Sequence, residues 1–271
     1  MVDPVSVSPV GDLHLQDPAD ASSRAASSHP AESADKLPSF CIALPTYNEA
    51  AAIENCVTNI SSFLGTVPAR TAIIAVDDGS SDKTWEILLQ LQRKFPSLIL
   101  ERHAKNGGYG AAQRTLCRVA VENGFEYALV MDADGTQAPH FIANFFEPMR
   151  RHIDLVKATR YDKGGTVKGV SWQRYWISRA GNLLARMVMG LPITDFTNGF
   201  RAIRTQAWTR ISTTERGFIV LIEEVYLAGK LGFSFAEVPY VLTVRQEEGS
   251  ESKFTYQWSI YWRYLHYIFK R

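Results

Sequence analysis

Three short apolar segments constrain the fold of this chain more than any other feature, because each is followed at once by polar or acidic residues. The segments cover residues 40–44, 71–76 and 127–131. Between them lie stretches of helical composition at residues 50–64, 82–94 and 110–122. Short strands alternating with helices of about 10–15 residues are typical of βαβ units, in which helices cover both faces of a parallel sheet. Ligands of such sheets bind at the carboxyl ends of the strands, so the residues that follow these segments are candidates for a binding site.

The overall composition is that of a globular protein. Of 271 residues, 46% are hydrophobic and 21% are charged, which excludes a wholly disordered chain, a collagen and a coiled coil. The 29 basic and 28 acidic side chains leave a net charge of +1, which argues against a nucleic-acid-binding protein. No apolar run approaches the roughly 20 residues of a transmembrane helix. The three cysteines are odd in number and widely spaced, which argues against a zinc site or a disulfide framework and fits a reducing compartment.

The first 36 residues differ from the rest of the chain. They contain five Asp and one Glu against one Arg and one Lys, are rich in Ala, Ser and Pro, and include no aromatic residue. Such a segment cannot bury enough surface to offset its loss of conformational entropy, so we predict that residues 1–36 form a disordered acidic leader. Residues 37–271 are predicted to form one α/β domain. Its second half has predicted helices at 171–191, 223–231 and 254–269 and a predicted strand at 237–244.

The central chemical feature is the pair Asp132-x-Asp134 at the end of the apolar segment 127–131. Two carboxylates one residue apart on an irregular turn can approach the same hard divalent cation. Mg²⁺ and Mn²⁺ favour oxygen ligands and commonly bridge protein carboxylates to substrate phosphates. The alternative is a solvated loop whose acidic residues only end the strand. The polar loops expected beside it favour the metal site.

Two further loops are expected at the same edge of the sheet. Residues 77–80, Asp-Asp-Gly-Ser, offer carboxylates to ribose hydroxyls or a base N–H, and the glycine permits close approach of a ligand to the backbone. Residues 45–49, Pro-Thr-Tyr-Asn-Glu, offer the Tyr47 ring for stacking on a base and Glu49 as a hydrogen-bond acceptor. The alternative is that the Asn and Ser of these loops cap the helices that follow. One loop can serve both purposes.

These loops belong to a longer set of motifs that runs in order through most of the predicted domain. The motifs are PTYNE at 45–49, DDGSSDKT at 77–84, NGGYGAA at 106–112, DAD at 132–134, TRY at 159–161, RYWISRAGN at 174–182, DFTNGFRA at 195–202, GFIVLIE at 217–223, EVPYVLTVR at 237–245 and GSESK at 249–253. With them the chain resembles the family 2 glycosyltransferases of GT-A fold, and more narrowly the dolichyl- or polyprenyl-phosphate glycosyltransferases. The resemblance implies a Rossmann-like, mostly parallel central sheet with helices on both faces.

The resemblance also implies roles for individual residues on the donor side. The nucleotide sugar would be held by residues of the three loops, which are Pro45, Tyr47, Glu49, Val76, Asp77, Asp78 and Asp132. Asp132 and Asp134 would bind the Mg²⁺ or Mn²⁺ ion that neutralises the diphosphate. The lipid-phosphate subgroup often has DADLQ, in which Gln is a third metal ligand. This chain has DADGTQ, so Gln137, the candidate for that ligand, stands one position late and Thr136 takes its place.

Basic residues of the second half gain a role from the same resemblance. The acceptor phosphate and the donor diphosphate would be bound by Arg160, Arg174, Ser178, Arg245 and Lys253, with Arg174 also counted as catalytic. A phosphate monoester is already largely dianionic near neutral pH, so it needs positioning rather than deprotonation to attack the sugar in line, with inversion. The implied function is transfer of a hexose, from GDP-mannose or UDP-glucose, to polyprenyl or dolichyl phosphate.

Three alternatives follow from the same residues. If the acceptor is a hydroxyl of a glycan or a small molecule, a general base is required, and Asp195 of the DFTNGFRA motif is the candidate. A nucleotide-sugar-binding module without catalytic activity is the second alternative. A nicotinamide-dependent dehydrogenase is the third, but no GxGxxG motif follows the first apolar segment, and residues 106–110 lack that spacing.

Two helical segments are predicted to lie on a membrane surface. Within 254–271, one helical face carries Trp258, Tyr261, Trp262, Leu265, Ile268 and Phe269, and segment 171–191 combines Trp172 and Trp176 with Arg174, Arg179 and Arg186. Aromatic residues favour the headgroup boundary and basic residues favour anionic lipid, which predicts a monotopic enzyme on the cytoplasmic face of a membrane. The alternative is that both stripes pack on the core. A membrane-anchoring partner protein is a further hypothesis, since related proteins often carry transmembrane helices beyond this point.

Overall fold

The structure is a computed structural model that describes residues 36–162, 164–167, 172–242 and 258–270. All of these lie in one compact unit, Ala34–Arg271. The predicted leader lies outside the described residues except for Lys36, so its disorder stays a prediction. Two of the predicted acceptor-binding residues, Arg245 and Lys253, also lie outside them.

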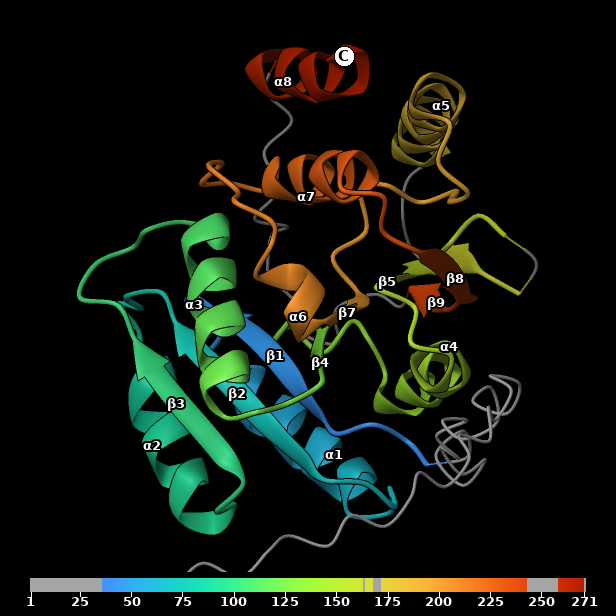
Figure 1. The fold of residues 1–271 in the computed structure, drawn as a ribbon. Coiled ribbons are helices and arrows are strands. Elements are labelled where there is room, and N and C mark those ends of the chain that lie inside the picture. The colour runs from blue at the N-terminus through green and yellow to red at the C-terminus, as the bar shows by residue number, and fades with distance from the viewer. Residues whose placement is uncertain (1–35, 163, 168–171, 243–257, 271) are drawn as a thin grey trace, which may run out of the picture. The chain divides into compact units, whose positions relative to one another are not determined.

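A mostly parallel sheet forms the centre of the unit (Figure 1), as predicted. In the part of the chain that the structure describes, seven strands are paired in the order β3-β2-β1-β4-β7-β5-β8. Their bounds in that order are Leu98–Arg102, Thr71–Asp77, Phe40–Thr46, Tyr127–Val130, Arg201–Arg204, Leu155–Thr159 and Phe235–Pro239. Strand β7 runs antiparallel to both of its neighbours, and the other pairs are parallel. Two short strands, β6 (Thr166–Val167) and β9 (Val241–Leu242), form a separate parallel pair.

Helices cover both faces of this sheet because successive strand residues point to opposite sides. In β1, Ile42 and Leu44 face a core that includes helices α1 (Ile53–Leu64), α2 (Thr84–Lys94) and α4 (Phe146–Arg150). Cys41 and Ala43 face a core that includes α3 (Tyr109–Glu122), α6 (Thr205–Trp208) and α7 (Val220–Lys230). A 3₁₀ segment, η2 (Pro139–Phe145), leads into α4. The α/β architecture with both faces covered is therefore confirmed.

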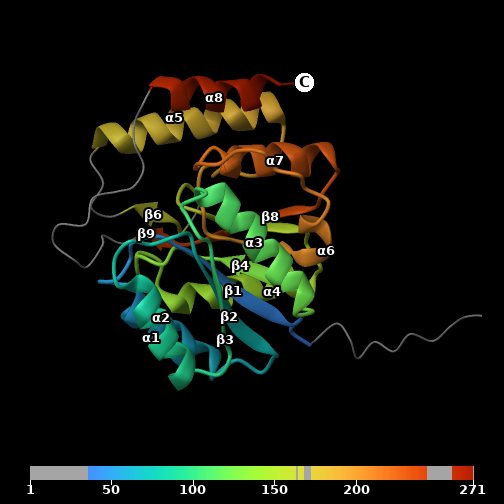
Figure 2. The same ribbon diagram turned by 90° about the vertical axis from the view of Figure 1, so that its left-hand side faces the viewer.

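Two further helices lie beyond α7. Helix α5 (Trp172–Met189) and helix α8 (Trp258–Phe269) lie side by side, and α8 also contacts α7 (Figure 2). Within the described ranges, every helix is too short or too polar to span a lipid bilayer. The position of α5 and α8 at one end of the unit leaves one long side of each available to a neighbouring surface.

The structure differs from the predicted elements in several respects. Helix α2 begins at Thr84 rather than at residue 82, although Asp82 still accepts a hydrogen bond from the backbone N–H of Thr84 at 3.0 Å. The strand predicted at 237–244 is divided at Tyr240 into β8 and β9 within its described part. Strands β3, β5 and β7 were not predicted. Of these, β7 has the largest effect on the site, because it pairs with β4 directly before Asp132.

Candidate active site

The loops after β1 and β2 are locked to each other at the carboxyl edge of the sheet. The Ser80 hydroxyl accepts a hydrogen bond from the backbone N–H of Asn48 at 2.9 Å, and the side-chain oxygen of Asn48 accepts one from the backbone N–H of Ser81 at 2.9 Å. Neither Asn48 nor Ser80 caps a helix, because the N-cap positions of α1 and α2 belong to Ala52 and Lys83. The capping alternative is therefore wrong. These side chains instead fix the loop that carries Tyr47 and Glu49.

The two aspartates after β2 are buried and have protein partners. Asp77 accepts hydrogen bonds from the backbone N–H of Ser80 at 3.2 Å and from its hydroxyl, and its Oδ2 lies 3.0 Å from Nε of Arg102. Asp78 accepts hydrogen bonds from the backbone N–H groups of Gly107 and Gly108, at 2.9 and 2.7 Å. These carboxylates therefore organise the loops around them. Their predicted contacts with a base or ribose stay predictions.

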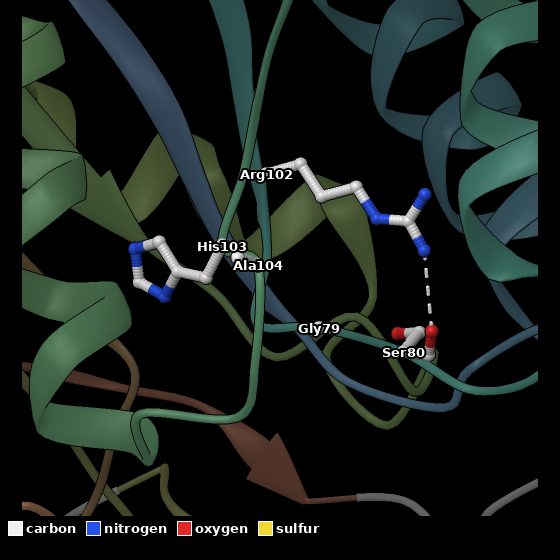
Figure 3. A pocket seen from close by; sticks show the side chains of 5 residues that line it. All are labelled: Gly79, Ser80, Arg102, His103 and Ala104. Carbon is white, nitrogen blue, oxygen red and sulfur yellow. Dashed lines mark hydrogen bonds between the residues drawn. The ribbon is translucent and has the colours of Figure 1, made fainter.

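A pocket of about 370 Å³ opens beside Asp77 and Asp78 at the carboxyl ends of β2 and β3 (Figure 3). It is lined by Gly79, Ser80, Arg102, His103 and Ala104. Figure 3 shows the side chains of Arg102 and His103 pointing to opposite sides of their strand. Gly79 has a φ of 72°, and a Cβ there would lie 2.7 Å from the backbone of Lys105, so only glycine fits this close approach. The lining residues from β3 were missed because that strand was not predicted.

His103 connects this pocket to the start of α3. Its Nδ1 lies 2.5 Å from the Asp78 carboxylate, and its Nε2 lies 2.8 Å from the hydroxyl of Thr115. Because Asp78 also holds Gly107 and Gly108, the imidazole and the glycine turn share one anchor. Helix α3 begins directly after Gly108, whose φ is 91°.

Asp132 and Asp134 follow β4 and are held in a tight turn. The side chain of Gln137 binds Asp132 twice, since its Oε1 accepts the backbone N–H at 3.0 Å and its Nε2 donates to Oδ2 at 2.7 Å. Oδ1 of Asp134 accepts hydrogen bonds from the backbone N–H and hydroxyl of Thr136, at 3.0 and 2.7 Å. The one-residue shift of Gln137 therefore still brings it to Asp132. Its role as a third metal ligand stays a prediction, because here its oxygen serves the backbone.

The acidic side chains of the β1 and β4 loops act electrostatically on one buried thiol. Burial raises the pKa of the Cys56 thiol to about 12, and the negative charges of Asp134, Glu49 and Asp132 add to this effect. No cluster of three His, Cys, Asp or Glu side chains in metal-ligating geometry occurs among the described residues. Asp132 and Asp134 nevertheless fit Mg²⁺ or Mn²⁺, which commonly take one or two carboxylates and leave the other positions to phosphate oxygens and water.

Asp195 and Arg160 form a buried ion pair. Nε and Nη2 of Arg160 donate to Oδ2 and Oδ1 of Asp195 at 2.7 and 2.9 Å, and Nη2 also donates to the Thr197 hydroxyl at 3.0 Å. Burial alone would raise the pKa of Asp195, but the charge and hydrogen bonds of Arg160 hold it below its ordinary value. The Asp195 carboxylate is fully buried, accepts hydrogen bonds on both oxygens and is weakly basic. These properties argue against a role as a general base.

The two predicted acceptor residues of α5 stand one turn apart, at positions 174 and 178. The Ser178 hydroxyl accepts a hydrogen bond from the Tyr161 hydroxyl at 2.7 Å, and Tyr161 follows Arg160 directly. The side chain of Arg174 lies outside the described part of the structure. The structure thus brings Arg160 and Ser178 into one neighbourhood through Tyr161, and the binding of phosphate there stays a prediction.

Comparisons with known proteins identify the family of this chain. The glycosyl transferase family 2 model matches residues 41–211. The chain is 31% identical over 209 residues to polyprenol monophosphomannose synthase of Mycolicibacterium smegmatis, covering 76% of this chain and 77% of that protein. It is 32% identical over 215 residues to undecaprenyl-phosphate mannosyltransferase of Micrococcus luteus, covering 78% of this chain and 85% of that protein.

A fold comparison gives the same class. Glucosyl-3-phosphoglycerate synthase from Mycobacterium tuberculosis, in complex with Mn²⁺, uridine diphosphate and phosphoglyceric acid, matches with a TM-score of 0.59 and 21% identity, over 80% of this chain and 74% of that chain. The chain therefore belongs to glycosyl transferase family 2 and is a glycosyltransferase of GT-A fold. Among its relatives it is similar to the polyprenyl-phosphate mannosyltransferases, as the sequence motifs indicated. The hypothesis of a membrane-anchoring partner protein finds no support in these comparisons.

Proposed function

We propose that this glycosyltransferase moves a hexose, mannose in the first instance, from a nucleoside diphosphate sugar to a polyprenyl phosphate, with inversion at the anomeric carbon. The observation that carries the proposal is the Asp132-x-Asp134 turn at the end of β4, which stands beside two loops suited to a nucleotide. The names of the relatives support the mannosyl group and the polyprenyl phosphate acceptor. Asp132 and Asp134 would hold a divalent ion, which neutralises the charge that develops on the departing diphosphate.

A phosphate acceptor suits the residues of the candidate site. A phosphate monoester has a second pKa near 6, so it attacks without a base to remove a proton. Both oxygens of Asp195 accept hydrogen bonds from Arg160, so this residue is poorly placed to act as a base. Transfer to a hydroxyl would need such a base, whereas the proposed transfer to a phosphate does not. Arg160 and Ser178 would orient the acceptor phosphate, with Arg174 one turn before Ser178 on α5. Arg suits this task because its planar guanidinium matches phosphate oxygens.

We further propose that α5 and α8 rest on the membrane that contains the acceptor. The outward side of α5 is apolar and strongly exposed, with 72% of Trp172 and 66% of Met187 accessible, and α8 adds Trp262 at 70%. A monomeric soluble protein rarely exposes a contiguous apolar patch of this kind unless it meets another surface. Exposed basic residues flank the stripe, namely Arg179 and Arg186 on α5 and Lys270 after α8, which favours anionic lipid.

The aromatic stripe predicted on 254–271 is divided in the structure. Ile268 is buried in the core, and Leu265 packs against it, while Trp262 and Phe269 are exposed. The side chains of Trp258 and Tyr261 lie outside the described residues. Core packing therefore applies to one side of α8, while the exposed side supports the proposed contact with lipid. Free thiols at all three cysteines fit the cytoplasmic face, where the compartment is reducing.

The test is transfer from labelled donor to lipid. Purified enzyme, Mn²⁺ and radiolabelled GDP-mannose or UDP-glucose are incubated with polyprenyl phosphate in vesicles that contain anionic lipid, and lipid-linked sugar is counted after extraction. Polyprenol without phosphate is the matched control acceptor, and we expect it to take no sugar. Absence of lipid-linked product with every common donor, or equal use of the alcohol, would overturn the proposal.

A further inference from the structure

Tyr109, the first residue of α3, reaches from the glycine turn toward the candidate metal site. Its ring stacks on Phe218, with ring centroids 4.8 Å apart and an angle of 30° between the planes. The backbone before it is fixed, because Gly108 donates a hydrogen bond to Asp78. Ring and backbone therefore set the direction of the side chain, and the hydroxyl at its tip has little freedom to turn elsewhere.

The hydroxyl of Tyr109 and the carboxylate of Asp132 converge on Gly199. Val130 pairs with Arg201 in the antiparallel β4–β7 ladder, and continuing this register by two residues sets Gly199 opposite Asp132. A Cβ added at Gly199 would lie 3.0 Å from the Tyr109 hydroxyl and 3.5 Å from Oδ1 of Asp132. The space between phenol and carboxylate is thus open only because residue 199 has no side chain.

The Tyr109 hydroxyl is buried, and Arg201 lies close enough to donate to its oxygen, but its own O–H donates to no acceptor among the residues that the structure describes. A buried O–H donor without an acceptor is costly, so it indicates an acceptor that arrives with a ligand or a small rearrangement. Arg201, the neighbouring cation, already donates to Glu224, Gln113 and the Gly199 carbonyl, and a guanidinium cannot accept a proton from a phenol. The charged group near the Tyr109 hydroxyl that can accept its hydrogen bond is therefore the Asp132 carboxylate.

We propose that Tyr109 is a positioning residue for Asp132, and that its phenol donates a hydrogen bond to Oδ1 when the divalent ion and nucleoside diphosphate are bound. Gln137 already donates to Oδ2. The two donors would hold the carboxylate from both sides and fix the lone pairs that face the ion. Residues that orient a metal ligand in this way typically contribute about 10–100-fold to metal affinity. This inference rests on the proposed function, since it takes Asp132 as a metal ligand.

The deciding experiment measures metal affinity rather than turnover. In Tyr109→Phe the ring that stacks on Phe218 is kept and only the hydroxyl is lost. Mn²⁺ binding is titrated by electron paramagnetic resonance of the free ion with saturating GDP present, and again with UDP. We expect Mn²⁺ to bind about 10-fold more weakly, with the melting temperature of the protein unchanged in the absence of metal. Tyr264→Phe is the matched control, because it also removes one phenol hydroxyl, which among the described residues donates to the Phe218 carbonyl at 3.5 Å, and we expect wild-type affinity.

Asp132→Asn separates failure of this inference from failure of the proposed function. If Asp132→Asn abolishes Mn²⁺ binding and Tyr109→Phe leaves it unchanged, the positioning role is wrong and the metal site stands. If Asp132→Asn binds Mn²⁺ as the wild type does, both proposals fall. A loss of affinity in Tyr109→Phe that is accompanied by a matching fall in melting temperature without metal would also overturn the positioning role, because the hydroxyl would then be structural.

Discussion

Replacing Asp195 by Asn distinguishes a carboxylate that anchors Arg160 from one that serves as a base. Asp195 has no exposed surface, and it accepts hydrogen bonds from Nε, Nη2 and the backbone N–H of Arg160. The amide would keep one acceptor oxygen but remove the negative charge. The Arg160 guanidinium would then lie nearly buried opposite a neutral group.

The structure sets the size of the expected loss. Removing one partner of a buried ion pair costs about 3–5 kcal/mol, because the other charge is left uncompensated. The Arg160 side chain keeps 16% of its surface exposed and still donates to the Thr197 hydroxyl, so we expect the lower end, about 3 kcal/mol. For a chain of this size 1 kcal/mol corresponds to roughly 2–4 °C, so the unfolding midpoint of Asp195→Asn should fall by about 6–12 °C. Adding Arg160→Met should restore part of this loss, because no buried charge then remains.

The effect should depend on pH in a direction that follows from the pKa of Asp195. Burial raises this pKa, but Arg160 outweighs burial and holds it below the ordinary value. A carboxyl group of lowered pKa stabilises the fold fully above its unfolded-state pKa of about 4, and this stabilisation is lost as the pH falls through the folded-state value. The difference in stability between wild type and Asp195→Asn should therefore be constant near neutral pH and shrink below about pH 4.

Thermal unfolding followed by circular dichroism at pH 7 measures the midpoint. Glu122→Gln is the control, since it removes an exposed carboxylate from an ion pair with Arg118 and should leave the midpoint unchanged. In transfer assays, loss of an anchor should raise KM for polyprenyl phosphate, whereas loss of a general base lowers kcat by about 100-fold or more. An unchanged midpoint together with a fall in kcat of that size would refute the anchoring role.

Three further outcomes are expected. Asp134→Asn should abolish Mn²⁺-dependent transfer and leave the melting temperature within about 2 °C of the wild type, since the amide oxygen of Asn can still accept the two hydrogen bonds that Thr136 donates. Trp172→Ser with Trp176→Ser should weaken binding to anionic vesicles by at least about 10-fold in a sedimentation assay, because each exposed indole contributes more than 1 kcal/mol when buried. Gly110→Ala should lower the unfolding midpoint by about 10 °C or prevent folding, because its Cβ would lie 2.0 Å from the Glu215 carbonyl oxygen.

Each of these has a result that contradicts it. Full turnover by Asp134→Asn at saturating metal would remove that residue from the metal site. If the double Trp variant binds vesicles as well as the wild type does, the α5 face does not meet lipid. Leu89→Ser, on the exposed side of α2, is the control for a general loss of apolar surface. A wild-type midpoint for Gly110→Ala would show that the 215–216 segment moves away from α3 at no cost.

The sequence predicted the three parallel strands β2, β1 and β4 because they are encoded locally. Strands β1, β2 and β4 are continuous apolar runs, and their residues face helices on both sides, so composition alone marks them. The acidic residues after β2 and β4 also stood out, because they end apolar runs. Motif resemblance then indicated the loops that carry the candidate site.

The antiparallel part could not be predicted because its burial depends on distant partners. Strand β7 has the sequence RAIR, and Arg201 within it is fully buried. That burial is possible only because Glu224 and Gln113, which are 23 and 88 residues away, accept its hydrogen bonds. Lys157 of β5 is buried in the same way against the carbonyl of Asn198. The local sequence pattern predicts that Arg201 and Lys157 are exposed to solvent, so it does not indicate strand β7 or strand β5.

The segment between α6 and α7 links the proposed membrane face to the donor side of the site. The Glu215 carboxylate accepts hydrogen bonds from Arg263 and Tyr267 of α8, and it is itself buried. The main-chain carbonyl of the same residue packs so closely on Gly110 of α3 that no side chain fits there. Glu215 therefore links helix α8 to the start of α3.

From that point the contacts continue to the nucleotide loops. The Arg216 carbonyl accepts the backbone N–H of Gly110 at 2.8 Å, and Gly107 and Gly108 just before it donate to Asp78. If α8 rests on a membrane as proposed, these contacts connect it to the loop beside the pocket at the ends of β2 and β3. An enzyme that joins a water-soluble donor to a lipid acceptor must hold both at once. Here a short series of backbone contacts and buried hydrogen bonds connects the proposed membrane face at α8 to the pocket at the ends of β2 and β3. The glycines at 108 and 110 are what allow that series to be so short, because any side chain at either position would push the 215–216 segment and α3 apart.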